Sequence, residues 1–451
     1  MKIQKQVPLT EGPILKSLTG LAVPIMISSF LGTLYNITDM AWIGLLGSKA
    51  VAAVGVGGMY VWLSQGLASL ARMGGQVHVA QCLGRGDKEQ AHRYAKTAVQ
   101  LSILLGLAFA AVSLLFTDPL VGFFKLEGVK TILDAKIYMR ITCGLILFSF
   151  LNLTLTGLYT AQGDSKTPFV ANFIGLLINL LLDPLLILGV GPFPRIEVAG
   201  AAVATVSAQL VVMLVMMVGV FRSKKEENVL KGIRLFESFS KEELGNICKI
   251  GGPTAIQGMV YCMISMVLTR MVAAFGAEAI ATQRVGGQIE SVSWNTADGF
   301  AAALNAFVGQ NYGAKKMDRV QKGYRISFWT VAIWGALIML AFIIFPGPIA
   351  GVFFHEEKAM EIAISYLIII GFSEAFMCVE LMTIGALSGL GKTKLCSVIS
   401  ITATSMRIPL AMVLSRTSLG LDGIWWALTL TSVAKGIIFY LTFRYQMREK
   451  C

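Results

Sequence analysis

The sequence predicts an all-α integral membrane protein with twelve transmembrane helices, in two parallel six-helix repeats that form two bundles around a central cavity. Its composition, the number of long apolar segments and an internal repeat predict this fold. Of the 451 residues, 55% are hydrophobic and 14% are charged, whereas soluble domains carry about 25% charged residues. The composition therefore indicates a multi-pass membrane protein.

Twelve segments are long and apolar enough to cross a bilayer, which takes roughly 20 apolar residues. In chain order they are residues 15–45, 52–80, 94–116, 135–161, 168–190, 199–221, 247–275, 281–311, 323–345, 360–388, 395–415 and 422–444. Several contain Pro or Gly, which neighbouring helices tolerate in a membrane by satisfying the freed backbone groups.

The two halves of the chain repeat each other at an offset of 229 residues. Gly47 then matches Gly276, and Gln81 matches Gln310. Because each copy holds six spans, both copies begin and end on the same side, so the repeats are parallel. This predicts an amino-terminal bundle over 1–221, a linker over 222–246 and a carboxyl-terminal bundle over 247–451.

Loop charges predict the orientation. The amino terminus and every second loop after it hold 25 of the 38 Lys and Arg residues, and the opposite loops hold seven. We therefore expect both termini to be cytoplasmic, with the protein in the cell (inner) membrane. The positive linker is expected to be a solvated cytoplasmic connector, with binding to anionic lipid or to a partner as an alternative. Because the charges lie in short loops between spans, the net charge of +12 does not indicate nucleic-acid binding.

Two aspartates break the symmetry of the repeats. Asp39 falls opposite Leu268, and Asp183 falls opposite Ala411 or Ile408, depending on where a short gap is placed. An ionised carboxylate in hydrocarbon costs at least about 2.5–3.5 kcal/mol, so each acid is expected to face a cavity or a partner.

Other polar residues accompany the two acids at helical spacing. Tyr35 and Asn36 share a face with Asp39 in the first span, and Asn172 and Asn179 share one with Asp183 in the fifth. Pro184 leaves the carbonyl group of Leu180 without its usual amide partner.

Both acids are expected at one depth in the membrane. Each lies eight residues before a glycine that ends its segment, Gly47 or Gly191, which puts both about 12 Å below the outer boundary. Two carboxylates at one depth can share a proton or, with amide and hydroxyl oxygens, bind a small cation such as Na⁺. Thr205 is a further candidate oxygen donor.

Other intramembrane residues are candidates for substrate binding. Met259 and Met263 belong to a methionine group that suits an adaptable surface, although at helical spacing such a group is more often ordinary packing. Glu374 and Glu380 could attract a cationic substrate, although ion pairs between helices are the expected role of most charges in these spans. No phosphate-binding loop occurs, so no nucleotide cofactor is expected.

These residues resemble the multidrug and toxic compound extrusion (MATE) transporters, from about Leu15 to Met447. The resemblance rests on the stretches 34–39, 44–52, 81–87, 162–168, 179–184 and 310–314. It implies a transporter, not an enzyme, that exports organic cations, drugs and other amphipathic compounds by alternating access, in exchange for H⁺ or Na⁺. A monomer suffices, because the duplication supplies both bundles, and membrane lipids are the expected surroundings.

The resemblance also implies an ion-coupling site at Asp39, Asn179, Asp183 and Thr205. Members with a cation site in the carboxyl-terminal lobe use an acid in the seventh span, but 247–275 contains neither Asp nor Glu, and Gln257 is the nearest polar substitute. This departure favours coupling through the amino-terminal lobe.

Two other functions are alternatives to this one. A flippase for lipid-linked oligosaccharide, from the same superfamily, would need a cavity lined with arginines and usually further helices. A membrane-embedded lipid transferase would need a cluster of catalytic residues at the interface, and the loops contain no such motif.

Overall fold

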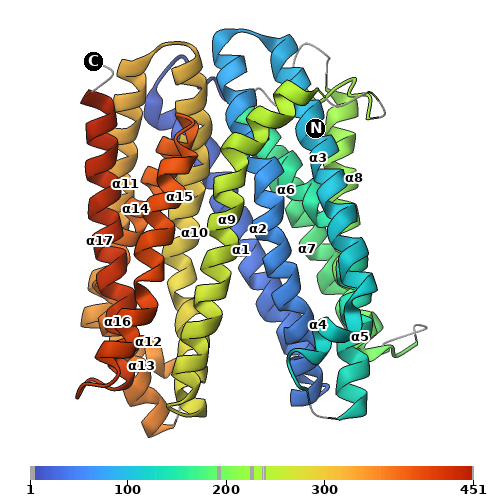
Figure 1. The fold of residues 1–451 in the computed structure, drawn as a ribbon, viewed down its shortest axis with the longest axis vertical. Helices are drawn as coiled ribbons and strands as arrows, with labels where there is room; N and C mark the ends of the chain where they lie inside the picture. Colours follow the sequence, from blue (N-terminus) through green and yellow to red (C-terminus); the bar gives the residue numbers. More distant parts are fainter. Residues whose placement is uncertain are drawn as a thin grey trace. The chain divides into compact units, whose positions relative to one another are not determined.

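The computed structural model describes residues 6–126, 128–189, 194–223, 228–235, 237, 240–354 and 356–448. Over these residues the chain is helical (Figure 1). The helices are α1 (Ile14–Gly44), α2 (Ser48–Arg85), α3 (Lys88–Leu115), α4 (Thr117–Gly122), α5 (Val129–Gly144), α6 (Leu147–Ala161), α7 (Lys166–Ile187), α8 (Glu197–Arg222), α9 (Lys241–Ala273), α10 (Ala277–Gly313), α11 (Met317–Ile344), α12 (Pro346–Gly351), α13 (Glu357–Gly371), α14 (Glu374–Gly389), α15 (Thr393–Ser405), α16 (Arg407–Leu414) and α17 (Leu421–Arg448).

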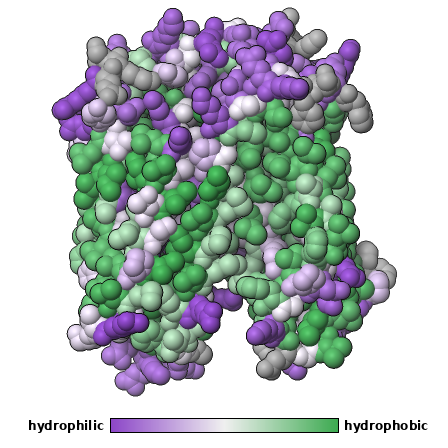
Figure 2. Space-filling model, in the orientation of Figure 1, coloured by the Kyte–Doolittle hydropathy of each residue, from purple (hydrophilic) through white to green (hydrophobic). Residues whose placement is uncertain are grey.

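The helices correspond to the twelve predicted segments. Among the described residues, nine helical spans are long and apolar enough to cross a membrane, or 11 when two bent helix pairs each count as one span. α10 occupies the place of the remaining segment; it has the length but carries Arg284, Glu290 and Asp298. Figure 2 shows apolar side chains along the middle of the helices and hydrophilic side chains at their ends.

Two predicted spans are bent instead of continuous. The segment 135–161 forms α5 and α6, which meet at 43°, and 360–388 forms α13 and α14, which meet at 50°. Each break follows a glycine, Gly144 or Gly371, that ends the first helix of the pair. Glycine is a weak helix former and is a common site of kinks, so the same break recurs in both repeats.

The short helices α4 and α12 were not predicted. They lie at matching places in the two repeats, directly after α3 and α11. α12 begins with Pro346, whose fixed φ angle suits the first turn of a helix. Their six residues are too few to show a helical period in the sequence.

The described chain divides into two compact units. Unit 1 contains Met1–Val7 and Ile27–Gly258, and unit 2 contains Pro8–Met26 and Met259–Cys451. α1 and α9 therefore each contribute to both units. The predicted domain ranges 1–221, 222–246 and 247–451 follow the sequence repeat instead and stay a prediction.

Packing within each unit accounts for this division. The early part of α9 supplies Ile247 to the largest core of unit 1, and its later part supplies Ile264 and Leu268 to a core of unit 2. The segment before α1 is held in unit 2, where Asn311 Nδ2 donates to the carbonyl oxygen of Leu9 at 3.0 Å.

The repeat is visible as one close contact in each unit. A Cβ atom on Gly57 would lie 2.4 Å from Tyr138 in unit 1, and one on Gly286 would lie 2.1 Å from Tyr366 in unit 2. The second span of each repeat therefore needs glycine where an aromatic ring of the fourth span packs against it.

Part of the linker folds onto unit 1. Val229 and Leu230 are buried, the amide group of Val229 donates to Gln162 Oε1 at 3.0 Å, and the carbonyl oxygen of Val229 lies 2.7 Å from His92 Nδ1. The expectation of a wholly solvated connector was wrong for these residues, because two apolar side chains anchor the segment in the core. Residues 224–227, 236, 238 and 239 of the linker lie outside the described residues, as does Gly191.

Candidate ion-coupling site

Unit 1 buries three of the predicted coupling residues together. Asp39 comes from α1, and Asn179 and Asp183 come from α7. Their exposed fractions are 8%, 1% and 0%. Asn179 Nδ2 donates to Asp183 Oδ1 at 3.2 Å, and Asp39 and Asp183 lie within electrostatic range of each other. The i, i+4 spacing of α7 thus produces the contact that the sequence predicted.

Each aspartate has one carboxylate oxygen that no described group satisfies. Asp39 Oδ1 and Asp183 Oδ2 are buried and accept no hydrogen bond. More than about 90% of buried polar groups in proteins have a partner. Two neighbouring carboxylates that are both ionised also repel each other. A bound proton or cation at this place would remove both penalties.

A tyrosine and a threonine extend the polar cluster. The Tyr35 hydroxyl group of α1 donates to Thr205 Oγ1 of α8 at 2.9 Å, and Tyr35 lies within electrostatic range of both aspartates. Three helices therefore supply the cluster. Its carboxylate, amide and hydroxyl oxygens are the ligand types that small hard cations prefer.

Tyr138 also belongs near the site, although the sequence did not predict it. This residue of α5 is 6% exposed and lies within electrostatic range of Asp39 and Asp183. Its packing against Gly57 fixes its position. No helical spacing could have found it, because it comes from another helix; its match with Tyr366 in the repeat was the available signal.

The other candidate residues of unit 1 are less buried than the two aspartates. Asn36 is exposed, and Asn172 and Gln257 are half-buried. The prediction that Asn36 shares the face of Asp39 is correct in spacing, but its side chain turns away from the buried side. A residue three positions before another on a helix is offset from it by about 60° around the axis, which is enough here to separate a buried side chain from an exposed one.

The remaining substrate-binding candidates belong to unit 2. Met259 is half-buried and Met263 is 61% exposed. Glu374, the first residue of α14, is fully buried, and neither of its carboxylate oxygens has a hydrogen-bond partner among the described residues.

Glu374 forms a second pair of acids with Glu290. Glu290 of α10 accepts a hydrogen bond from the Tyr366 hydroxyl group of α13, and Glu290 and Glu374 lie within electrostatic range of each other. Sequence spacing gave Glu290 no clear partner along its own helix, because its partner lies on another helix. Unit 2 thus also holds a tyrosine and two carboxylates, of which Glu374 is buried and Glu290 is half-buried; its carboxylates come from different spans than those of unit 1.

Other buried charges of unit 2 are paired. Lys435 Nζ lies 2.8 Å from Glu380 Oε1, which is the ion pair between helices that the sequence favoured. Arg407 donates to Thr431 Oγ1 at 3.0 Å and to Ser432 Oγ at 2.9 Å. Glu380 therefore has a local partner.

Transition-metal chemistry has no obvious site in the described part of the chain. No group of three or more His, Cys, Asp and Glu side chains there could hold a metal ion. The cluster of unit 1 pairs two aspartates with amide and hydroxyl oxygens instead, a set that suits a proton or Na⁺.

Repeated units of membrane-length helices, with unpartnered carboxylates buried inside the spans, define a membrane transporter. The family model described as MatE matches the chain twice, over residues 24–185 and 253–413. The chain belongs to this family, whose members are transporters and not enzymes. The resemblance found in the sequence is confirmed, as is the all-helical membrane fold.

Individual relatives cover nearly the whole chain. The chain is 29% identical to the "Probable multidrug resistance protein NorM" of Thermotoga maritima, over 98% of this chain and 95% of that protein. It is 25% identical to the "FAD transporter" of Shewanella oneidensis, over 96% and 95%. Its fold is similar to a crystal structure of a MATE protein in the straight conformation, with a TM-score of 0.90, 24% identity and 99% coverage of both chains.

Proposed function

We propose that this transporter exports amphipathic organic cations and drugs across the cell membrane, in exchange for protons or sodium ions that move inward. The observation that carries this proposal is the pair of buried, unpartnered oxygens of Asp39 and Asp183 in unit 1. The names of relatives, such as the multidrug resistance protein of Thermotoga maritima, support the choice of cargo.

In the proposed cycle the two aspartates carry the coupling ion. With the cavity open to the outside, they take up a proton or Na⁺, which removes the cost of a buried unpartnered charge. The loss of negative charge weakens the attraction for a cationic drug, so the drug leaves. The ion-loaded state then closes outside and opens inside, where the ion departs and another drug binds.

Obligatory exchange requires that ion and drug bind antagonistically. By linkage, an ion that weakens drug binding is itself weakened by the drug to the same extent. Asn179 serves this exchange by holding Asp183 through its amide group, and Thr205 and Tyr35 offer hydroxyl oxygens that can turn toward a bound cation.

The cargo is expected to contact both polar and apolar groups. Candidate contacts are Tyr35, Asn36, Asn172 and Gln257 in unit 1, and Met259, Met263 and Glu374 in unit 2. Exposed methionines suit ligands of varied shape, and a buried glutamate favours cations. A relative that is named for FAD transport makes a metabolite cargo a case to include in the assay.

We further propose that the protein works as a monomer in the cell (inner) membrane, with both termini cytoplasmic. The excess of Lys and Arg in alternate loops supports this orientation. No cofactor other than the coupling ion is needed for the proposed exchange.

The proposal is tested by efflux of ethidium, a fluorescent organic cation, from proteoliposomes. A pH gradient and a sodium gradient are imposed separately on the wild type, Asp39→Asn and Asp183→Asn. Asp318→Asn is the matched control, because Asp318 is exposed in the first turn of α11. We expect efflux driven by one of the gradients in the wild type and the control, and at least about a tenfold loss in each site variant, a loss that matches roughly 1.4 kcal/mol.

Other outcomes would count against the proposal. Efflux that neither gradient drives, from folded protein, would refute ion coupling. Transport of a lipid-linked oligosaccharide in place of cations would favour the flippase. Unchanged efflux in both aspartate variants would move the coupling site elsewhere, and the acids Glu290 and Glu374 of unit 2 would be tested next.

A further inference from the structure

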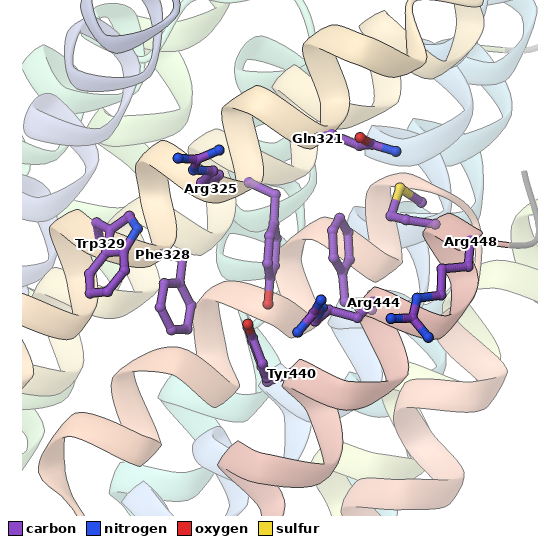
Figure 3. Close-up of a pocket in the computed structure, with 10 residues that line it drawn as sticks. Gln321, Arg325, Phe328, Trp329, Tyr440, Arg444 and Arg448 are labelled. Carbon is purple, nitrogen blue, oxygen red and sulfur yellow. The ribbon is translucent and has the colours of Figure 1, made fainter. Parts of the chain in front are cut away.

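A groove on unit 2 is lined by aromatic rings and guanidinium groups. It lies between the first half of α11 and the end of α17, and has a volume of about 560 Å³. Both helices pack against α14. Figure 3 shows Arg325, Phe328 and Trp329 on the α11 side of the groove and Tyr440, Arg444 and Arg448 on the α17 side. No residue of the candidate ion-coupling site lines this groove.

The three arginines are cationic groups without acidic partners. Arg325, Arg444 and Arg448 are all exposed, and none of them forms an ion pair with another described residue. Arg444 instead lies over the Tyr440 ring, 5.9 Å from its centre. Three guanidinium groups around one groove repel one another unless an anion joins them.

The walls and floor of the groove are formed by aromatic rings that pack on one another. The Tyr324 ring stacks on Phe443, with ring centres 3.6 Å apart, and its hydroxyl group pairs with Thr383 of α14 at 2.9 Å. Phe328 packs against Tyr440 at 5.1 Å. The groove therefore offers an apolar body beside a cationic rim, which suits an amphipathic anion more than a free inorganic ion.

The internal repeat shows what contacts the equivalent of this groove in unit 1. At the offset of 229 residues, Arg325 corresponds to Lys96 of unit 1. Lys96 Nζ contacts the Glu237 carboxylate of the linker at 2.8 Å. The counterpart of Trp329 is Gln100, which donates to the carbonyl oxygens of Leu235 and Glu237. In unit 1 the linker thus supplies an anion to this position, whereas in unit 2 no described segment does.

The surface beyond the groove is apolar and exposed. Trp329, Ile333 and Leu337 follow one another at four-residue spacing along α11 and are 59%, 57% and 56% exposed. This stripe begins at the guanidinium groups and continues along a membrane-spanning helix. An acyl chain could lie along it while its head group stays with the arginines.

We propose that this groove binds an anionic phospholipid of the cytoplasmic leaflet. The phosphate group lies among Arg325, Arg444 and Arg448, the glycerol backbone lies on the aromatic wall, and one acyl chain follows the stripe of Trp329, Ile333 and Leu337. The bound lipid supplies to unit 2 the anion that Glu237 supplies to unit 1. This proposal depends on the membrane location of the protein and is independent of its cargo.

Quenching of Trp329 fluorescence by brominated lipids tests the proposal. Full-length protein is placed in phosphatidylcholine nanodiscs that contain either brominated phosphatidylglycerol or brominated phosphatidylcholine. The contribution of Trp329 is the difference between the wild type and Trp329→Phe. We expect quenching by the anionic lipid at a mole fraction at least about tenfold lower than by the zwitterionic lipid, since each Arg near an anionic surface contributes about a fivefold factor in affinity.

Charge variants separate the groove from general surface attraction. The triple variant Arg325→Gln/Arg444→Gln/Arg448→Gln is expected to lose the preference for the anionic lipid. The matched control is the triple variant Arg222→Gln/Lys249→Gln/Lys394→Gln, which removes the same charge from exposed residues outside the groove. It is expected to keep the preference for the anionic lipid. Equal behaviour of the two triple variants would overturn the proposal.

Two further measurements decide between sources of the anion. Millimolar glycerol 3-phosphate is expected to leave the quenching unchanged; competition would show that the groove takes a soluble organic phosphate, and would overturn the lipid proposal. Removal of residues 449–451 is expected to leave the lipid preference unchanged. Loss of the preference after that removal would show that Lys450, and not the groove, attracts the anionic lipid, and would overturn the proposal.

Discussion

The buried ion pair of Lys435 and Glu380 tests whether the buried charges of unit 2 stabilise its fold. The two side chains are each 6% exposed, and Nζ lies 2.8 Å from Oε1. At an effective dielectric constant of about 20, two unit charges at the distance of 2.8 Å attract by about 6 kcal/mol. This gain is largely offset by the cost of removing both charges from water.

The variants Glu380→Gln and Lys435→Met each leave one buried charge without its partner. We expect each single substitution to lower the free energy of unfolding by about 3–5 kcal/mol, whereas the double substitution should cost far less. In Glu380→Gln the remaining ammonium group of Lys435 is also repelled by the cation of Arg407, which lies within electrostatic range. The coupling energy between the two sites is therefore expected to be about 3 kcal/mol and favourable.

The assay is unfolding of the purified protein in mixed micelles by increasing fractions of a denaturing detergent, followed by tryptophan fluorescence. A coupling energy below about 0.5 kcal/mol would refute the reasoning, because independent sites add within that margin. Single variants with wild-type stability but weakened drug binding would show that Glu380 serves the cargo instead of the fold.

Two further predictions concern packing and pH. Gly57→Ala should destabilise unit 1 by about 1–3 kcal/mol in the same assay, because its Cβ atom would collide with Tyr138. The control is Gly58→Ala, whose Cβ atom would meet no atom within 4 Å and which should be neutral or stabilising. A similar loss of stability in both variants would contradict the packing argument. The contact with Lys96 lowers the pKa of Glu237 below its usual value, so its contribution to linker docking is present above the usual glutamate range and is lost as pH falls through the lowered pKa. The protection factors of amides in residues 228–235, which are exchange rates corrected for the intrinsic effect of pH, should therefore fall on acidification in the wild type. In Glu237→Gln they should be lower and should lack this step, and an identical pH response in both proteins would exclude this contact.

Sequence patterns were sufficient for the helices because bilayer thickness leaves a clear length and hydropathy signal. All twelve predicted segments have a helical counterpart. The breaks after Gly144 and Gly371 were missed, since glycine is common in membrane helices and a break depends on what packs beside it. The sequence predicts α10 as a membrane span because the segment is long enough to cross the bilayer, even though it contains several charged residues.

The site was predictable where its residues share a helix. Asn179 and Asp183 are four residues apart, and their hydrogen bond follows from helix geometry. Their neighbours Asp39, Thr205 and Tyr138 come from other helices, and a single sequence does not encode which helices adjoin. The broken symmetry of the repeats pointed to Asp39, and the resemblance to a family placed Asp39 and Thr205 in one site with the residues of α7. Tyr138 and the pairing of Glu290 with Tyr366 emerged only from the structure.

The measurement that most directly tests the central claim is the dependence of drug affinity on the coupling ion. Binding of tetraphenylphosphonium to the purified protein is measured across pH and across sodium concentration, for the wild type and for Asp39→Asn/Asp183→Asn. We predict that protons or sodium ions weaken binding to the wild type, and that the double variant binds with an affinity that neither ion changes. An ion dependence that persists unchanged in the double variant would contradict the assignment of coupling to these two aspartates.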